Sequence, residues 1–376
     1  MVNKIKQYPI VLIFFIFLIG FSVFDAWYPK RPFSELENRT LQQYPTISLS
    51  GVLDNSWMVK YEAYVKDQFA LRDNWIELKS LSETASLKTE NNDILFGKDN
   101  YLFKKTLAVN SRFDTNLGAL ERFTQRHAGQ VDVMIVPSAS TVLTSLLPAY
   151  APIANENEYL DKIFSTVGST ANVYDMREVL SQHSGEYIYY RTDHHWTALG
   201  AFYAYEQYAS ANGKPVFDRG ASEAVEVPDF YGTSYSSARR IGAIADTITY
   251  YNLSNVMTVF NTQTDGSVTQ ETGTLYDTEK FATRDKYAAF LRGNNGYSEV
   301  QGNGEGSILV VKDSYANSFI PYLTADYAKI GVVDFRANLT KIDKIMQDSG
   351  YDKVLFLYSF DGFSSDTYFG SKIASE

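Results

Sequence analysis

The chain has 376 residues, of which 45% are hydrophobic and 21% charged, a composition that supports a packed core and excludes a largely disordered chain. The formal net charge of −10 argues against a nucleic-acid partner, because phosphate binding requires clustered lysine and arginine. The absence of cysteine excludes disulfides, thiolate zinc sites and a cysteine nucleophile.

Residues 1–27 predict a transmembrane anchor. Lys4 and Lys6 precede an uncharged apolar run from Tyr8 to about Phe24, whose length lies at the short end of the range for a membrane-spanning helix. The stretch GFSVFDAW lacks the small residues of a signal-peptide cleavage site, which favours an anchor that is retained. The basic end is expected to stay in the cytoplasm, so the rest of the chain is expected outside the cell membrane.

Residues 28–90 predict a stalk and a helical arm. Residues 28–45 are polar and rich in turn formers, as in an extended arm. Between residues 55 and 88, aromatic and apolar residues such as Trp57, Tyr61 and Trp75 recur at helical spacing. This pattern predicts one or two helices.

Residues 91–376 predict an α/β domain. Residues 94–105 are expected to form a hairpin. Apolar runs predict strands at residues 131–137, 171–176, 186–190, 306–311, 329–335 and 353–360, and helical segments are expected at 158–167, 198–211, 316–328 and 341–348. Strands that alternate with helices indicate a mostly parallel sheet covered on both faces. Residues 213–305 break the alternation and predict a loop- and β-rich insertion that shapes a cleft.

The stretch RTDHHWTALG, residues 191–200, holds two of the four histidines. It falls between an expected strand and an expected helix, where catalytic groups of open α/β sheets gather. In extended backbone Asp193 and His195 point the same way, and a carboxylate beside an imidazole fixes its tautomer. His195 is therefore the candidate base, while His194 is expected to pack or to support the site.

Two other interpretations of this stretch stay open. A metal site would need further ligands, yet HExxH is absent and His127 and His183 are isolated, so we expect no metal. A structural role would make Asp193 or Thr197 a helix cap.

The stretch GSILVVKDSYANSFIPYL, residues 306–323, supplies a candidate nucleophile. An apolar strand runs into Ser314 and a helix is expected to follow, which places the hydroxyl at the C-terminal end of the sheet. The backbone N–H groups of Ser314 and Tyr315 are then expected to form an oxyanion hole. The G-x-S-x-G elbow of α/β-hydrolases is absent, and a helix N-cap is the alternative role for Ser314.

Together, TDHHW and KDSYANSF resemble the DHHW proteins of Gram-positive bacteria. That family is similar to the extracytoplasmic alginate O-acetyltransferase proteins, an SGNH-hydrolase-like group with a permuted chain order. Further blocks that resemble the family are SELENRTL, YVKDQFALRDNW, FGKDNYLF, VPSAST, FYGTSYS and VVDFR. The resemblance implies a three-layer α/β sandwich and a Ser–His–Asp triad, carried here by Asp193, His195 and Ser314. It also implies a membrane-bound O-acyltransferase as partner.

The chain departs from the alginate group at position 194 and at the turn from Lys312 to Tyr315, so the substrate does not transfer with the resemblance. The expected activity is O-acyl transfer, acetyl foremost, on a cell-envelope polysaccharide through an acyl ester of Ser314, without a cofactor. Candidate oxyanion and substrate contacts are Lys312, Tyr315, Asn317, Arg336 and Trp196.

Two alternative functions remain. In a carbohydrate O-acetylesterase, water rather than a sugar hydroxyl would take the acyl group. In a non-catalytic glycan-binding protein, the tyrosine-containing insertion at 213–305 would carry the function.

Overall fold

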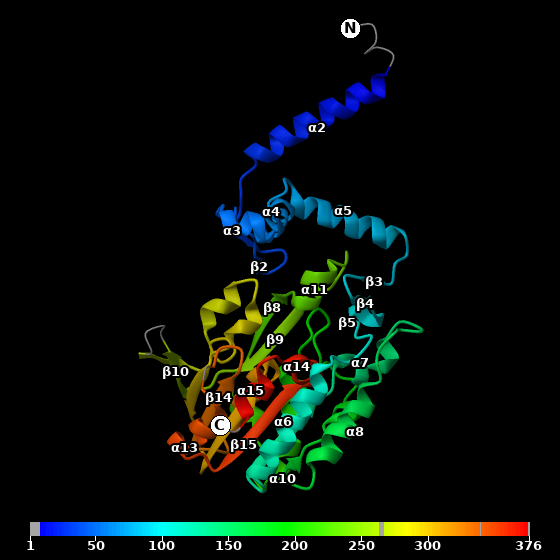
Figure 1. The fold of residues 1–376 in the computed structure, drawn as a ribbon. Coiled ribbons are helices and arrows are strands. Elements are labelled where there is room, and N and C mark those ends of the chain that lie inside the picture. Colours follow the sequence, from blue (N-terminus) through cyan, green and yellow to red (C-terminus); the bar gives the residue numbers. More distant parts are fainter. Residues whose placement is uncertain (1–7, 263–266, 339, 375–376) are drawn as a thin grey trace. The chain divides into compact units, whose positions relative to one another are not determined.

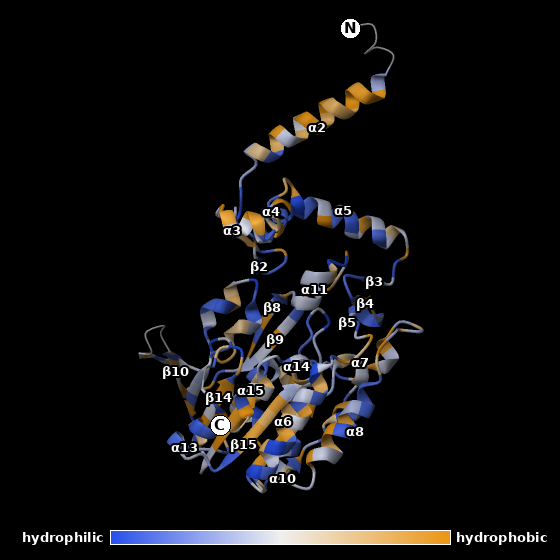
Figure 2. Cartoon of the chain, in the orientation of Figure 1, coloured by the Kyte–Doolittle hydropathy of each residue, from blue (hydrophilic) through white to orange (hydrophobic). Residues whose placement is uncertain are grey.

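The computed structural model describes residues 8–262, 267–338 and 340–374, and the chain divides into two compact units, residues 1–88 and 89–376. The apolar N-terminal run forms helix α2 (Pro9–Trp27), which begins with proline, a residue well suited to a first helical turn. Its mean hydropathy of 2.5 and lack of buried residues fit a membrane span or a signal sequence (Figure 2). Lys4 and Lys6 lie outside the described residues.

The first unit also contains three helices joined by tight turns, α3 (Leu49–Leu53), α4 (Ser56–Asp67) and α5 (Arg72–Ala85). The segment expected to form a stalk is folded against them and includes two short paired strands, β1 (Phe33–Ser34) and β2 (Arg39–Thr40). Arg31 forms a 2.7 Å ion pair with Asp73, and Arg72 forms a 2.5 Å ion pair with Glu37. These contacts hold residues 28–45 on α4 and α5.

The second unit is built on an eight-stranded sheet (Figure 1). In spatial order the strands are β11 (Val268–Thr274), β10 (Val256–Thr262), β12 (Tyr297–Gln301), β14 (Lys329–Asp334), β13 (Ser307–Lys312), β15 (Lys353–Ser359), β6 (Val131–Val136) and β7 (Asn172–Val173). The five strands from β14 to β7 run parallel, and β12, β10 and β11 continue the sheet in antiparallel pairing. The expected mostly parallel sheet is confirmed.

Two hydrophobic cores cover the two faces of this sheet, because its central strands are apolar at successive positions. On β13, Ile308 and Val310 face one core, and Leu309 and Val311 face the other. The first core is closed by α9 (Arg177–Gln182), α10 (Ala198–Ala211) and α12 (Ile320–Leu323). The second is closed by α6 (Arg112–Arg126), α8 (Glu156–Val167), α13 (Ile342–Ser349), α14 (Phe360–Ser365) and α15 (Phe369–Ile373). The layers are therefore helix, sheet, helix.

Two expected elements are wrong. Residues 186–190 form no strand of the sheet; Tyr189 makes one isolated bridge to Trp196 and its hydroxyl donates to the carbonyl of Pro137 at 2.7 Å, so the run is buried as a loop. The helix expected at 316–328 is reduced to a 3₁₀ turn, Ser314–Ser318, followed by α12. Pro321 has no N–H to donate, so a continuous helix through this position is unfavourable.

The segment 213–305 is more than an insertion of loops. Strands β8 (Ala224–Phe230) and β9 (Asp246–Tyr251) form a separate antiparallel pair, while β10, β11 and β12 extend the edge of the main sheet. Helix α11 (Thr233–Ala238) follows β8. The hairpin expected at 94–105 is confirmed as β4 (Ile94–Phe96) and β5 (Leu102–Lys104), with β3 (Glu90–Asn91) beside it.

Candidate active site

The C-terminal ends of parallel strands bring the candidate site together. Strand β13 lies between β14 and β15, and Asp313 and Ser314 follow it directly. The loop that precedes α10 meets this edge, because the indole N–H of Trp196 donates to the carbonyl of Tyr315 at 2.9 Å. Two segments that lie far apart in the sequence are therefore fixed beside each other.

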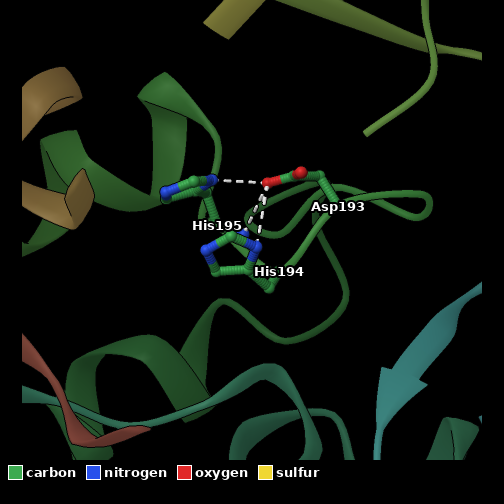
Figure 3. A group of neighbouring side chains, drawn as sticks. All are labelled: Asp193, His194 and His195. Atoms are coloured by element: carbon green, nitrogen blue, oxygen red, sulfur yellow. Dashed lines mark hydrogen bonds and ion pairs between the residues drawn. The ribbon is translucent and has the colours of Figure 1, made fainter. Parts of the chain in front are cut away.

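Asp193, His195 and Ser314 form one continuous hydrogen-bonded chain. Nδ1 of His195 lies 2.5 Å from Oδ1 of Asp193, and Nε2 of the same ring lies 2.7 Å from Oγ of Ser314. The side chains of Asp193 and His195 are almost fully buried. Figure 3 shows the imidazole of His195 aimed at the carboxylate of Asp193. This is the geometry in which an imidazole can take a proton from a hydroxyl.

Thr233 holds the carboxylate of Asp193 from the side opposite His195, and we call these contacts the clamp. Oδ2 of Asp193 accepts hydrogen bonds from the backbone N–H of Thr233 at 2.7 Å and from its hydroxyl at 3.0 Å. Although burial opposes it, the neighbouring imidazoles and these hydrogen bonds hold the pKa of Asp193 well below its usual range. A Cβ at position 232 would lie 2.2 Å from Oδ2 of Asp193, so Gly232 is required by this close approach.

The ring of the neighbouring His194 lies against that of His195, with the centroids 3.9 Å apart, but has a different hydrogen-bond partner. Its Nδ1 lies 2.6 Å from the hydroxyl of Thr233, and its side chain is 42% exposed. His194 thus contacts Thr233, which also binds Asp193, and lies outside the chain of hydrogen bonds from Asp193 to Ser314.

Asp193, His194 and His195 are also the one group among the described residues whose ligand atoms lie close enough together to suggest a metal site. Oδ1 of Asp193 and Nδ1 of His195 are within hydrogen-bond distance of each other, and Nε2 of His195 is bonded to Ser314, so the ring nitrogens are engaged in hydrogen bonds. This donor set fits a proton relay better than a metal centre.

Tyr287 covers one face of the His195 imidazole. Its ring stacks on His195 with a centroid separation of 4.0 Å and an interplanar angle of 16°. Burial raises the pKa of the Tyr287 phenol, so it remains a donor, and it donates to the carbonyl of Ser314 at 3.1 Å. Sequence analysis missed Tyr287, because residues 213–305 contain no motif that marks it.

A second carboxylate shapes the turn that carries Ser314. Asp313 accepts hydrogen bonds from the N–H of Tyr315 at 2.9 Å and from the N–H and hydroxyl of Ser359 at 2.9 and 2.6 Å. The Tyr315 N–H is therefore committed to Asp313, and its expected role in an oxyanion hole is wrong. Among the described residues, the Ser314 N–H donates to no backbone carbonyl outside its own turn.

A family model described as DHHW protein matches residues 99–333, well over half of the chain. The chain belongs to the DHHW protein family.

Three solved structures show similarity to this chain. A DHHW family protein from Eubacterium siraeum is 23% identical with a TM-score of 0.64, over 76% of this chain and 98% of that one. Bacillus cereus PatB1 is 21% identical with a TM-score of 0.61, over 73% of this chain and 98% of PatB1, and it has also been solved with a sulfonyl adduct. The O-acetyltransferase domain of Pseudomonas putida AlgJ is 13% identical with a TM-score of 0.43, over 74% and 98% of the two chains. No curated protein matches the chain.

In this DHHW protein the remaining candidate residues form a support for the strand ends. Lys312 is buried and its ammonium donates to Asn294 at 3.0 Å and to Asp334 at 3.2 Å. Arg336 is bound to the same Asp334 carboxylate through two of its nitrogens. Burial opposes ionisation of Asp334, but the two cations lower its pKa to about 2. The Nδ2 group of Asn317 donates to Asn294 at 3.2 Å.

These contacts correct two predictions. Trp196 is fully buried and anchors the Tyr315 backbone, so its expected contact with substrate is wrong. The amide of Asn317 is turned toward Asn294 and is 1% exposed, which also places it away from substrate. Lys312 and Arg336 do line the cavity in front of Ser314, although both are paired with Asp334.

That cavity has a volume of about 650 Å³ and opens directly on Ser314. His194 and Thr233 form part of one wall. Its other polar and aromatic lining residues include Asp93, Lys104, Tyr358, Asp361, Asp366 and Tyr368. Lys104 is paired with Asp361 at 3.0 Å. The cavity therefore presents many hydrogen-bonding groups and little unpaired positive charge, in a volume typical of ligand sites.

Proposed function

We propose that this DHHW protein is an extracytoplasmic O-acyltransferase, acetyl foremost, that acts on a cell-envelope polysaccharide. The observation that carries the proposal is the hydrogen-bonded chain from Asp193 through His195 to Ser314, which ends at a cavity of about 650 Å³. The proposal includes an SGNH-hydrolase-like fold. That description depends on a triad in which an Asp and a His two residues apart act on a serine at the edge of the sheet.

The first half-reaction forms an acyl ester on Ser314. Oγ of Ser314 attacks the carbonyl carbon of the donor while its proton passes to Nε2 of His195, 2.7 Å away. The bond between the carbonyl carbon and the donor's leaving oxygen then breaks, and His195 returns the proton to that oxygen. Asp193 stays ionised throughout and stabilises the imidazolium.

Two further groups of the site favour the charged states of this reaction. The N–H of Ser314 can donate to the oxyanion that forms on the carbonyl oxygen. The face of the Tyr287 ring lies against His195 and can stabilise the positive charge that the imidazole gains.

The second half-reaction transfers the acyl group to a sugar hydroxyl. His195 takes the proton of that hydroxyl, the sugar oxygen bonds to the acyl carbon, and the ester bond to Oγ of Ser314 breaks with return of the proton to Ser314. The exposed ring of Tyr368 offers a surface on which a sugar can stack, and the carboxylates of Asp93 and Asp366 can accept hydrogen bonds from its hydroxyls. Helix α2 would hold the site at the membrane, beside a membrane-bound O-acyltransferase that supplies the acyl group.

The test uses the full chain in detergent, incubated with an acetyl ester donor with and without polysaccharide acceptors. Intact-protein and peptide mass spectrometry should find one acetyl group on Ser314, and the label should move to the acceptor. Ser314→Ala should abolish both steps, while Ser237→Ala, at an exposed serine of the same cavity, should retain them. A sulfonyl fluoride should modify Ser314 in competition with the donor.

If the rate of donor cleavage is the same with and without every acceptor, the protein is a carbohydrate O-acetylesterase instead. Glycan binding without any acyl adduct, and equal donor cleavage by Ser314→Ala, would leave only a binding protein and would refute the proposed chemistry.

A further inference from the structure

Exposed apolar side chains are concentrated in residues 28–88. Among the described residues, fifteen large hydrophobic side chains are exposed in this segment, against eight in all of residues 89–376. On helices α3, α4 and α5 they include Leu49, Leu53, Met58, Trp75, Leu78 and Leu81. A surface that faces only water carries such residues singly, so this density indicates a surface that is covered by something apolar.

Helix α5 presents its exposed apolar residues as one stripe. Trp75, Leu78 and Leu81 follow one another at intervals of three, which places them on one side of the helix, and they are 43%, 53% and 52% exposed. Ser80, which projects from the opposite side, is buried. The inner side of α5 thus packs within the protein, and its apolar side faces outward.

The junction between α4 and α5 is fixed to the C-terminal end of α2. The ring of Phe21 lies 5.2 Å from that of Phe69 and 6.5 Å from that of Trp75, between centroids. The carboxylate of Asp25 accepts the N–H of Ala70 at 2.6 Å. Trp75 therefore sits both in the apolar stripe of α5 and against the last turns of α2.

This connection determines the depth of the start of α5 in a bilayer that α2 spans. Helix α2 has 19 residues, so it is about 28 Å long and close to the thickness of the hydrocarbon region, ~30 Å. Phe21 precedes the helix end at Trp27 by six residues, which is ~9 Å along the axis. When α2 spans the membrane with Trp27 at the outer boundary, Phe69 and Trp75 lie up to ~9 Å below that boundary, within the depth to which interfacial helices insert.

The aromatic residues of α4 suit the same environment. Trp57 and Tyr61 stack with centroids 5.0 Å apart, and Tyr44 meets Tyr61 edge to face at 6.1 Å. Tryptophan and tyrosine are enriched at membrane–water interfaces because they combine an apolar ring with a polar atom.

We propose that helices α3, α4 and α5 form a membrane-seated collar, whose exposed apolar residues insert into the outer leaflet around the end of α2. The occupant of this surface is lipid, because the surface is continuous with the lipid-facing helix through Phe21, Phe69 and Trp75. The inference rests on the proposed role of α2 as a retained anchor. The collar gives the chain a second, shallow attachment that restricts how α2 can tilt and rotate.

The chain contains no cysteine, so single cysteines can be introduced and labelled with an environment-sensitive fluorophore. We would place the full chain in vesicles of phosphatidylethanolamine and phosphatidylglycerol with the label at Leu78→Cys or Leu81→Cys. Controls are Ile13→Cys within α2, Glu77→Cys outside the stripe of α5, and Tyr150→Cys, fully exposed in the second unit. Lipids with a spin label near the headgroup quench fluorophores at that depth, and iodide quenches those in water.

We expect the labels at positions 78 and 81 to be quenched by the headgroup-proximal lipid at least threefold more strongly than the label at 150, with weaker access to iodide. The label at 77 should be intermediate, and the label at 13, four residues from the start of α2, should respond to quenchers in the acyl-chain region and not to iodide. If iodide quenches the labels at 78 and 81 as strongly as the label at 150, the proposed membrane insertion of the collar is refuted, while the anchor role of α2 is not. Protection from both quenchers at 78 and 81 also refutes the insertion of the collar, because a protein would then cover the stripe. Failure of the label at 13 to insert overturns the anchor and the collar together.

Discussion

The ring of Tyr287 lies parallel to the imidazole of His195, with the ring centroids 4.0 Å apart, and its hydroxyl donates to the carbonyl of Ser314. One side chain therefore contacts both the candidate base and the backbone of the candidate nucleophile. Since burial keeps the phenol neutral, its contribution to the imidazolium comes from the face of the ring and not from a negative charge.

Removal of this ring should slow acyl transfer more than removal of its hydroxyl. Tyr287→Leu loses an aromatic–cation interaction of roughly 0.5–2 kcal/mol, which corresponds to a loss of about 2- to 30-fold in kcat. Tyr287→Phe keeps the ring and should stay within about threefold of the wild type. Steady-state kinetics with an acetyl ester donor provide the measurement. Equal losses in the two variants would show that the hydrogen bond to Ser314 matters and the stacking does not.

The two adjacent histidines should respond very differently to substitution. His195→Ala removes the group that accepts the serine proton, and Asp193→Asn removes the charge that orients it, so each should lower kcat/KM by about 10³-fold or more. His194→Ala leaves the chain of hydrogen bonds from Asp193 to Ser314 in place and should cost roughly tenfold at most. Rates of acyl-enzyme formation measure this difference, and a larger loss in His194→Ala than in His195→Ala would contradict our assignment.

The sequence was sufficient for the elements that local pattern determines. The apolar runs of β6, β13, β14 and β15 indicate strands buried on both faces, and their alternation with helices predicts parallel pairing. The spacing of Asp193 and His195 predicted that these two side chains meet, and they do, although residues 191–195 form bends and not the extended backbone from which the prediction was argued.

The parts that depend on long-range packing could not be predicted. Thr233 and Tyr287 reach the site from residues 213–305, whose polar composition carries no period that marks a partner for His195. Whether the Tyr315 N–H is free depends on the rotamer of Asp313, and that rotamer is set by Ser359 at the end of another strand. The run at 186–190 shows the same limit, since apolar residues can be buried in a loop as well as in a strand.

The clamp on Asp193 should depend on the absence of a side chain at position 232. Gly232→Ala would place a methyl group 2.2 Å from Oδ2 of Asp193 and force the carboxylate away from His195. We expect a loss of kcat similar to that of Asp193→Asn together with a lower thermal midpoint, because the new methyl group would also overlap Cβ of the buried Asp193. Gly185→Ala is the matched control, because a Cβ there meets nothing within 4 Å. Full activity of Gly232→Ala would show that the carboxylate tolerates displacement.

Glu156 should make the stability of the fold depend on pH. Its carboxylate is buried and accepts the N–H of Ser138 at 2.8 Å and the Ser138 hydroxyl at 2.6 Å. Burial raises its pKa to about 7, from an ordinary value of 4.5, despite these hydrogen bonds. The folded state therefore holds this proton more tightly than the unfolded state does, so the stability that it contributes is complete below pH 4.5 and is lost as the pH rises toward 7.

Glu156→Gln should remove this dependence, because glutamine keeps an acceptor for the Ser138 N–H and does not ionise. Relative to the variant, the free energy of unfolding of the wild type should fall by about 3 kcal/mol between pH 4.5 and pH 8. Denaturant titrations at a series of pH values measure the difference. Glu158→Gln, at an exposed position in the same helical turn, should leave the pH profile of the wild type unchanged. The contradicting result is a free energy of unfolding that differs between the wild type and Glu156→Gln by the same amount at every pH in this range. That result would mean that Glu156 is already ionised in the folded protein at pH 4.5, with its charge stabilised by Ser138.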